Sequence, residues 1–274
     1  MPYSNFNLKA ATYEQNALVQ KSASEVLLKL ISIQENEDVL DLCCGPGNVT
    51  RKIASLTDGK VVGVDISEGM VKEAIRSNSD LPNVNYFVKD VKNLGFTNRF
   101  DVIYCNSAFQ WFLNPKKTLE QCLEALKPGG RMGIQSPATE NYCPNFVAAV
   151  KKVHAEPATK KIFSSFQSPW FFLDSAEEYR QLFEDCGFHV IHCELKSESA
   201  RYSVDQVYRI YQSGAENGYL NQNYYSIPLT NAYIETFRHL VKESIKEQAD
   251  TTGMVELKFF RIYLIAQRLE NANE

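Results

Sequence analysis

Short apolar runs alternate with amphipathic stretches between residues 38 and 137. The apolar runs are "EDVLDLCC", "KVVGVD", "VNYFVKD", "FDVIYCNSAF" and "RMGIQSP". The stretches between them carry helix signals, such as Ser67 as an N-cap, and Asn114 before a helix that Gly129 and Gly130 should end. Strands that alternate with helices at this spacing predict βαβ units. Right-handed crossovers then place helices on both faces of a mostly parallel sheet.

The pattern changes on either side of this core. A polar arm and a helix whose apolar face includes Ala23, Leu27 and Leu30 precede it, and helices mixed with two further strands follow it. We therefore predict an α/β fold: a Rossmann-like, doubly wound, mostly parallel seven-stranded sheet with a helical cap formed by insertions. The chain is then one domain over 1–274, with lid helices in 1–37, a ligand-binding core in 38–137, cap insertions in 138–172 and 203–250, and remaining sheet elements in 173–202 and 251–270.

Charge and apolar content argue against several classes of protein. The formal net charge of −4 is unlike that of a general nucleic-acid binder, and no apolar run approaches the roughly 20 residues that span a bilayer. The polar start of the chain lacks a secretory signal pattern, and the seven cysteines, an odd number, lie mostly in apolar segments. We therefore expect a soluble cytoplasmic protein with reduced thiols that binds neither nucleic acid nor membrane.

The stretch "LDLCCGPGNVT" joins the first expected strand to the next helix and predicts a ligand site. Gly45 and Gly47 allow backbone N–H groups to approach a ligand, and Asp65, at the end of the second expected strand, is placed to bind ribose hydroxyls. A dinucleotide fingerprint needs a third glycine where Thr50 stands, so the turn favours a ligand without a pyrophosphate. Asp41 is an acid inside an apolar strand, and we expect it to organise the turn or to contact the ligand.

Four elements in order, "LDLCCGPG", Asp65, "VKD" and "NSAFQWFLNP…LKPGG", resemble class I S-adenosylmethionine-dependent methyltransferases over residues 8–137. The resemblance implies S-adenosylmethionine as cofactor and S-adenosylhomocysteine as its product. It also implies that the glycine-rich turn passes under the methionine part, that the acid ending strand two holds the ribose, and that the acid after strand three contacts the adenine. The expected cofactor-binding residues are Tyr13, Gln20, Asp41, Gly45, Gly47, Asp65, Ile66, Met70, Asp90, Val91, Asn106 and Ala108.

A narrower resemblance joins "ATYEQNALVQKSASEVLL" and "NSAFQWF" to the malonyl-acyl-carrier-protein, trans-aconitate and juvenile-hormone-acid carboxyl methyltransferases. It implies O-methylation of a small-molecule or acyl-thioester carboxylate, the latter carried on an acyl carrier protein. In such enzymes an N-terminal helix closes over the cofactor, which makes Tyr13 and Gln20 lid contacts. Residues 138–250 match neither group closely and are expected to select the acceptor. Because a carboxylate needs a cationic or donor-rich pocket, we select Trp111, Trp170, Arg201 and Tyr202 for it.

Other interpretations stay open at this point. The acceptor could be nitrogen, sulfur or carbon on another metabolite, or the chain could bind its cofactor without catalysis; a nicotinamide-dependent dehydrogenase is the least favoured. The acceptor's identity and the oligomeric state are also left open.

Two cysteine motifs and one basic run have structural explanations. Cys43 and Cys44 should point to opposite faces of a strand, and the segment Cys186–Cys193, with its two histidines, spans a helix end and alternate strand faces, so we predict no metal. The basic run Lys151–Lys161 is expected to be a solvated face, with docking of an acidic carrier protein as the alternative.

Overall fold

A computed structural model describes residues 18–270, with side chains described from residue 23 onward. Its sheet has seven strands in the order β3-β2-β1-β4-β5-β7-β6. Neighbouring strands are parallel except for β7, which is antiparallel to both β5 and β6. This confirms the predicted doubly wound α/β fold. The strands are β1 (Val39–Leu42), β2 (Val61–Asp65), β3 (Val84–Val88), β4 (Phe100–Asn106), β5 (Leu126–Pro137), β6 (Phe188–Ser203) and β7 (Met254–Arg268).

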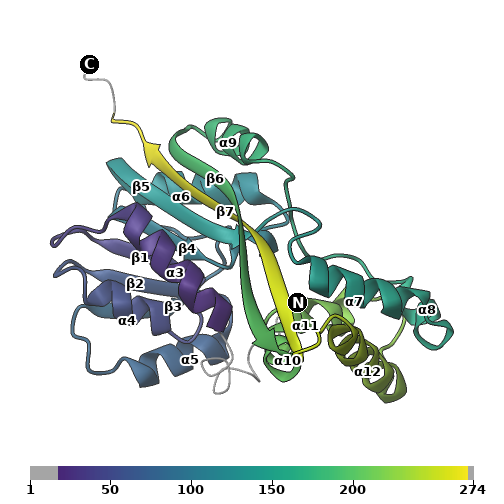
Figure 1. Cartoon of the computed structure of the whole chain (residues 1–274). Coiled ribbons are helices and arrows are strands. Elements are labelled where there is room, and N and C mark those ends of the chain that lie inside the picture. Colours follow the sequence, from purple (N-terminus) through teal and green to yellow (C-terminus); the bar gives the residue numbers. More distant parts are fainter. Residues whose placement is uncertain (1–17, 271–274) are drawn as a thin grey trace.

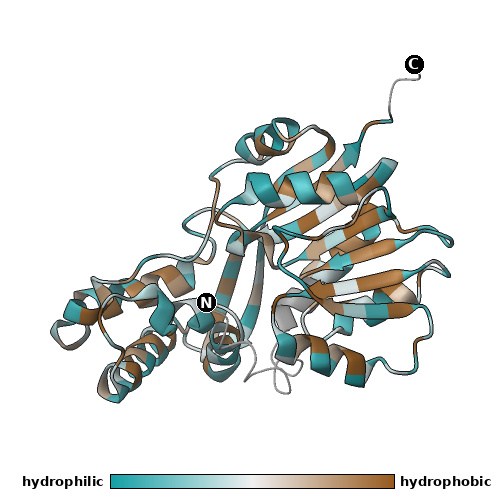
Figure 2. Cartoon of the chain, turned by 180° about the vertical axis from the view of Figure 1, so that it is seen from behind, coloured by the Kyte–Doolittle hydropathy of each residue, from teal (hydrophilic) through white to brown (hydrophobic). Residues whose placement is uncertain are grey.

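Helices cover both faces of the sheet, and the strands between them are strongly apolar (Figures 1 and 2). One face carries α3 (Leu18–Ile31), α4 (Asn48–Ala54) and α5 (Glu68–Ser77), and the other carries α6 (Pro115–Ala125) and α9 (Ala176–Glu184). The alternation of side chains along each strand supplies both layers. In β4, Tyr104 packs with the α3 side, whereas Ile103 and Cys105 pack with α6 and α9. Burial on both faces explains why these strands are apolar throughout.

A helical cap lies beside the sheet (Figure 1). Its elements are α7 (Pro144–Ala155), α8 (Pro157–Phe163), α10 (Val204–Ser213), α11 (Glu216–Tyr219), the 3-10 turn η2 (Gln222–Tyr224) and α12 (Asn231–Glu247). The cap has an apolar core of its own, rich in tyrosine and phenylalanine. Strands β6 and β7 continue into it as a two-stranded ribbon beyond Pro137, the end of β5. The cap therefore lies beyond the carboxyl end of β5, at the edge where ligands bind in open α/β sheets.

Several local predictions were wrong. Helix α6 ends at Ala125, and Gly129 and Gly130 instead lie in an irregular stretch of β5, where the pairing with β4 shifts register. A Cβ at Gly130 would lie 2.9–3.1 Å from three backbone oxygens, so the glycine serves a close backbone approach and not a helix end. Leu30, expected on the apolar helix face, is 38% exposed. Helix α8 was not expected, and β6 is far longer than the predicted strand because its second half pairs with β7 alone.

Candidate active site

Five polar side chains lie on one face of the sheet toward its carboxyl edge, namely those of Asp41, Asp65, Asn106, Gln135 and Arg261. Because side chains alternate along a strand, residues two or four positions apart point to the same face. Each of the five residues lies two or four positions from a residue that packs on the α3 side, so all five point to that side. These reference residues are Val39, Val61, Tyr104, Gly133 and Ile265. The topology thus aligns residues from five strands into one polar row.

Asp65 ends β2 and links two turns. Its Oδ2 accepts a hydrogen bond from the Gly45 N–H (3.0 Å), and its Oδ1 accepts one from the Ser67 N–H (2.8 Å). Burial raises the pKa of Asp65, and hydrogen bonds from the backbone of Ser67, Gly45 and Ile66 oppose that rise. Each carboxylate oxygen can accept a further hydrogen bond. Asp65 can therefore hold the glycine-rich turn and still take two ribose hydroxyls.

Asp41 is a buried acid directly before that turn. Its side chain is 3% exposed, and the Thr50 hydroxyl donates to its Oδ2 at 2.6 Å. Burial raises the pKa of Asp41 to about 7, with the Thr50 hydrogen bond opposing the rise and the charge of Asp65 adding to it. Thr50, the residue in place of a third glycine, is itself fully buried and serves this acid.

The two glycines of the turn have different surroundings. Gly45 has φ +55°, and apart from its chain neighbours no described residue has an atom within 4 Å of the position a Cβ would take, so there is room for a ligand beside the backbone. Gly47 has φ +86°, and its Cβ position lies 2.4 Å from Asn78 Nδ2 and 2.8 Å from the Tyr86 hydroxyl. Gly47 therefore permits tight packing inside the protein, whereas Gly45 borders the open side of the turn.

Further residues that were selected for the cofactor site follow β2 and β3. Asp90 is half-buried, and its Oδ1 accepts a hydrogen bond from the Lys92 N–H (2.9 Å). Val91 packs against the core, and Ile66 is half-buried beside Asp65. Met70 is buried in the first turn of α5. Asp90 keeps acceptor capacity for an adenine amino group, as the resemblance implies.

A network of amides and hydroxyls joins the ends of β4 and β5. In the orientation that satisfies its amide, Gln135 Nε2 donates to Asn106 Oδ1 (2.9 Å) and to Ser107 Oγ (3.0 Å). The Ser136 hydroxyl donates to Gln110 Oε1 (2.7 Å), and Gln110 Nε2 donates to the Ser107 carbonyl (3.0 Å). The adjacent Ala108 is buried and precedes the 3-10 turn η1 (Phe109–Trp111). This edge therefore has neutral polar groups in fixed positions.

Comparison with known proteins agrees with this geometry. Residues 39–130 match the family model described as a methyltransferase domain. A trans-aconitate 2-methyltransferase of Rhodopseudomonas palustris is 25% identical over 252 residues, which cover 88% of this chain and 91% of the relative. A malonyl-[acyl-carrier protein] O-methyltransferase 2 of Ilyobacter polytropus is 32% identical over 142 residues, 50% of this chain and 54% of the relative. The chain therefore contains a methyltransferase domain over residues 39–130, and along most of its length it is similar to known methyltransferases.

The methyltransferase fold extends over nearly the whole chain. A solved Haemonchus contortus phosphoethanolamine N-methyltransferase 2, in complex with S-adenosylhomocysteine, superposes with a TM-score of 0.58 at 16% identity, covering 96% of this chain and 58% of that one. S-adenosylmethionine is the cofactor, and the open side of Gly45 and the acceptor capacity of Asp65 fit it. The chain spans about half to three fifths of the length of several curated relatives that it matches.

The structure brings together two of the four residues selected for the acceptor pocket of the methyltransferase. The Trp111 and Trp170 rings lie 5.8 Å apart, centroid to centroid, and join the sheet-side core to the cap core. Tyr202 packs on the cap core from the ribbon. The side chain of Arg201 is 56% exposed and forms an ion pair with Asp250, so its charge is compensated in solvent; its role in the acceptor pocket stays a prediction that this geometry does not favour.

Arg261 is the functional candidate that the sequence reasoning missed. It is 2% exposed in β7, and its Nη1 donates to Gln135 Oε1 (2.8 Å). The sequence carried a signal for it, because Arg261 is the one charged residue in the apolar run "FFRIYLIA", and a buried charge without a partner is costly.

Some residues singled out from the sequence lie outside the described residues, and one lies in a different element from the one predicted. Tyr13 and the side chain of Gln20 lie outside the described residues, so their expected lid contacts stay predictions. Cys43 is not on a strand as predicted but in a turn with φ +61°, after β1 ends at Leu42. Within residues 18–270, no group of three or more His, Cys, Asp or Glu side chains is arranged to hold a metal ion. No helix in the same range is long and apolar enough to cross a bilayer.

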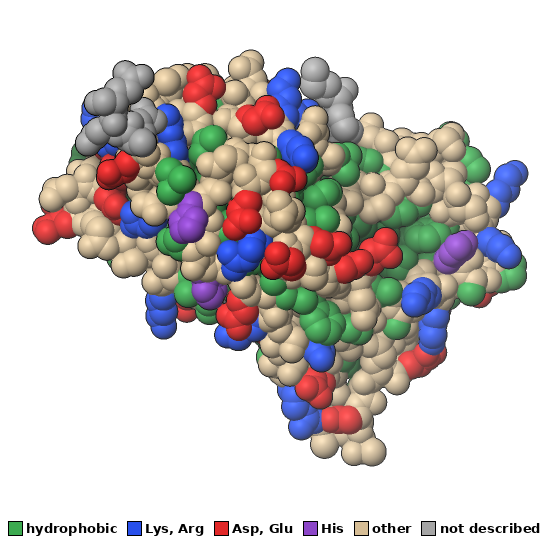
Figure 3. Space-filling view, turned by 90° about the horizontal axis from the view of Figure 1, so that it is seen from above, with side chains coloured by type: hydrophobic (Ala, Val, Ile, Leu, Met, Phe, Trp, Pro, Cys, Tyr) green, Lys and Arg blue, Asp and Glu red, His purple; other side chains and the backbone are tan. Residues whose placement is uncertain are grey.

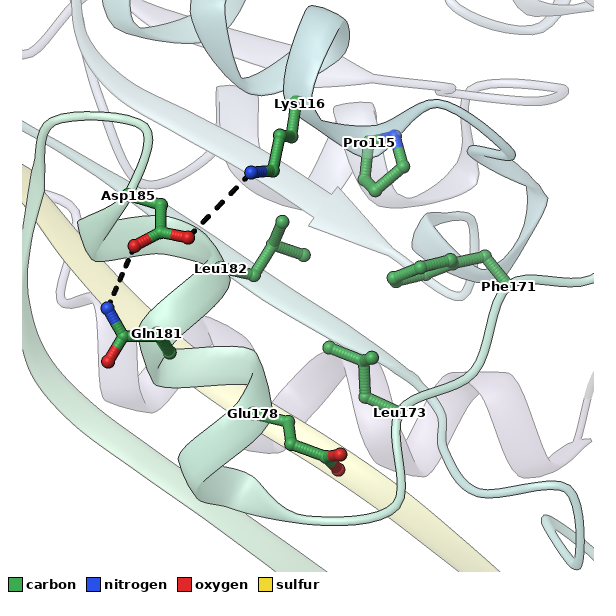
Figure 4. Close-up of a pocket in the computed structure, with 8 residues that line it drawn as sticks. All are labelled: Pro115, Lys116, Phe171, Leu173, Glu178, Gln181, Leu182 and Asp185. Atoms are coloured by element: carbon green, nitrogen blue, oxygen red, sulfur yellow. Dashed lines mark hydrogen bonds and ion pairs between the residues drawn. The ribbon is translucent and has the colours of Figure 1, made fainter.

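A surface hollow lies between the start of α6 and helix α9 (Figure 4). Lys116 and Asp185 form an ion pair across it at 3.7 Å, and Leu182 lies between the two helices. The residues lining this hollow include none of the five in the polar row. It is therefore separate from the polar row.

Charges are mixed on the surface of the methyltransferase. Figure 3 shows Lys and Arg side chains interspersed with Asp and Glu over one face of the molecule. The run Lys151–Lys161 lies in α7 and α8, which reach the far end of the cap (Figure 1). Lys152 there pairs with Glu247, whereas Lys151, Lys160 and Lys161 are exposed.

Proposed function

We propose that this methyltransferase transfers the methyl group of S-adenosylmethionine to a carboxylate oxygen of a small-molecule or carrier-bound acid. The supporting observation is the chemistry at the ends of β4 and β5, where Asn106, Ser107, Gln110, Gln135 and Ser136 form a network of amides and hydroxyls. None of these groups removes a proton at neutral pH. A carboxylate acceptor needs no base because it is already ionised, whereas most other acceptors do.

The residues of the chain would act by positioning. S-adenosylmethionine supplies a methyl group on a sulfonium, so the oxygen–carbon bond forms as the sulfur–carbon bond breaks and S-adenosylhomocysteine leaves, with no proton to remove. Asp65 orients the ribose and holds Gly45 in place. Asn106, which accepts a hydrogen bond from Gln135, lies at the end of β4 and would stand beside the acceptor. The contact between Trp111 and Trp170 closes the joint to the cap and excludes water, which favours a step that neutralises two opposite charges.

Two relatives support a carboxylate acceptor by the activities in their names, trans-aconitate methylation and malonyl-carrier methylation. A carrier-bound acceptor would have a landing surface in the exposed lysines of the run Lys151–Lys161, since acyl carrier proteins are acidic and charge steers such encounters. A free acid would need no such surface. We place nucleic acid outside the substrate class, in keeping with the net charge of −4.

The test measures the release of S-adenosylhomocysteine when the protein is given different acceptors, two of which are paired with uncharged analogues. Laurate, phenylacetate, trans-aconitate and malonyl-acyl carrier protein are each offered, and laurate and phenylacetate are compared with their carboxamides. Turnover of at least one acid without turnover of its carboxamide is the expected result, and the variant Asp65→Ala should abolish it at low cofactor concentration. Equal turnover of the carboxamides, or turnover confined to amine and thiol acceptors, would contradict the proposal. Tight cofactor binding without turnover of any acceptor would favour a non-catalytic role.

A further inference from the structure

Arg261 is a buried cation at the joint between the sheet and the cap. Of the lysine and arginine side chains that the structure describes, Arg261 alone is buried. Its guanidinium carbon lies 4.8 Å from the ring centroid of Phe259, a residue of the cap core. Toward the sheet, its Nη1 donates to Gln135 (2.8 Å), which in turn donates to Asn106 (2.9 Å). The cation is therefore two hydrogen bonds from the residue that ends β4.

The guanidinium has fewer acceptors than its burial requires. Among the described residues, its one hydrogen bond is to Gln135, and the buried Nε has none. Glu198 Oε2 lies 3.4 Å from Nε, an ion pair without hydrogen-bond geometry, and the other oxygen of Glu198 accepts from the Tyr263 hydroxyl (3.1 Å). Removal from water lowers the pKa of Arg261. A buried arginine with five N–H donors normally has several acceptors, because unpaired donors of a charged group are costly.

We propose that Arg261 binds the carboxylate of the methyl acceptor. This inference deepens the proposed function and rests on it. A guanidinium matches a carboxylate with two parallel hydrogen bonds, which would supply the acceptors that Arg261 lacks. Arg261 lies on the same sheet face as Asp65 and Asn106, so an acid held there is aligned with the row that starts at the ribose site.

The surroundings of Arg261 also indicate the kind of acid. Phe259, Phe146 and Tyr211 form a chain of ring contacts leading from the guanidinium into the cap, with centroid distances of 5.7 Å and 5.2 Å. Trp111 and Trp170 close the joint on the sheet side. One buried cation beside an aromatic interior suits a single carboxylate on an apolar body, so a monocarboxylic acid should be preferred to a polycarboxylic one.

The experiment compares Arg261→Lys and Arg261→Met with the matched control Arg131→Met. Arg131 also lies in the sheet, but it forms a structural two-bond pair with Glu37 (2.6 and 2.8 Å). Four quantities are measured for each variant: KM and kcat for laurate and phenylacetate, the Kd for S-adenosylmethionine by calorimetry, and the thermal shift caused by laurate in the presence of S-adenosylhomocysteine.

Arg261→Met should raise KM for the acids by about 100-fold and Arg261→Lys by about 10-fold, because truncating one partner of a buried charge pair carries costs of this size. The Kd for S-adenosylmethionine should stay within about threefold, the laurate-induced shift should vanish, and Arg131→Met should leave KM unchanged. Arg261→Lys keeps a charge and much of the stem, so it remains informative if Arg261→Met fails to fold.

Wild-type KM and a wild-type laurate shift in Arg261→Lys would overturn the inference, as would a wild-type protein that shows no shift with any acid. Turnover of acids that does not depend on Arg261 contradicts this inference alone. Turnover of amines or thiols and of no acid contradicts the proposed function itself, so the two failures are distinguishable.

Discussion

Replacing Asp65 with alanine should weaken S-adenosylmethionine binding by about 100-fold or more. In the structure this half-buried carboxylate accepts hydrogen bonds from the Gly45 and Ser67 N–H groups and retains one acceptor site on each oxygen. A hydrogen bond to a charged acceptor contributes about 1.5–3 kcal/mol, so two ribose hydroxyls contribute about 3–6 kcal/mol. At about 1.4 kcal/mol for each tenfold change, the loss is about 100-fold to 10,000-fold. Water entering the vacated space recovers part of it, which favours the lower end.

The assay is isothermal titration with S-adenosylmethionine and with S-adenosylhomocysteine. Both contain the same ribose, so the substitution should weaken both by the same factor. Asp65→Asn keeps the shape but loses the charge, and a loss of about 10-fold is expected. Asp80→Ala is the matched control, since Asp80 is 64% exposed and paired with Arg51. A folded Asp65→Ala protein whose affinity lies within threefold of the wild type would refute the reasoning.

Other predictions concern Asp41, the two glycines of the turn and Arg201. The pKa of Asp41 is raised to about 7, so between about pH 4 and pH 7 the folded state holds a proton that the unfolded state has released. The free energy of unfolding should therefore fall as pH rises through that window, by at most about 1.4 kcal/mol per unit, and denaturant titrations should show a flatter profile for Asp41→Asn. Gly47→Ala places a Cβ 2.4 Å from Asn78 Nδ2 and should destabilise the fold in the same titrations by about 1–3 kcal/mol more than the cost of its positive φ alone. Gly45→Ala meets no atom of the described residues within 4 Å, apart from its chain neighbours, and should cost only about 1–2 kcal/mol of stability from its positive φ, with its main effect on cofactor affinity. Equal losses of stability in both variants would contradict this distinction. Arg201→Ala should leave kcat and KM for every acid unchanged, and a raised KM would restore Arg201 to the acceptor site.

The sheet and the position of Asp65 at the end of β2 were predictable from the sequence because the relevant signals are local. Each strand–turn–helix unit lies within about thirty residues, and the acid that ends β2 is read directly from "KVVGVD". The Ser67 N-cap was equally local, and its side chain accepts from the Met70 N–H as expected. The glycine pair in "LKPGG" was ambiguous, since two glycines fit both a helix end and an irregular strand.

The acceptor side was not predictable because its contacts are distant in sequence. Arg201 looked available until the ribbon of β6 and β7 placed Asp250 beside it, 49 residues away. Gln135 and Arg261 meet only because β7 inserts antiparallel between β5 and β6. Periodicity alone puts an arginine on a strand face, and only the topology shows that the same face carries the polar row.

The fate of the transferred methyl group tests the central claim most directly. The wild-type protein is incubated with methyl-labelled S-adenosylmethionine and the acid that releases S-adenosylhomocysteine fastest, and the labelled product is treated with mild alkali. A methyl ester is hydrolysed to labelled methanol, in a one-to-one ratio to the S-adenosylhomocysteine formed, and this is the predicted result. Label that stays on the product after alkali would show a methyl group on nitrogen, sulfur or carbon and would contradict carboxyl methylation.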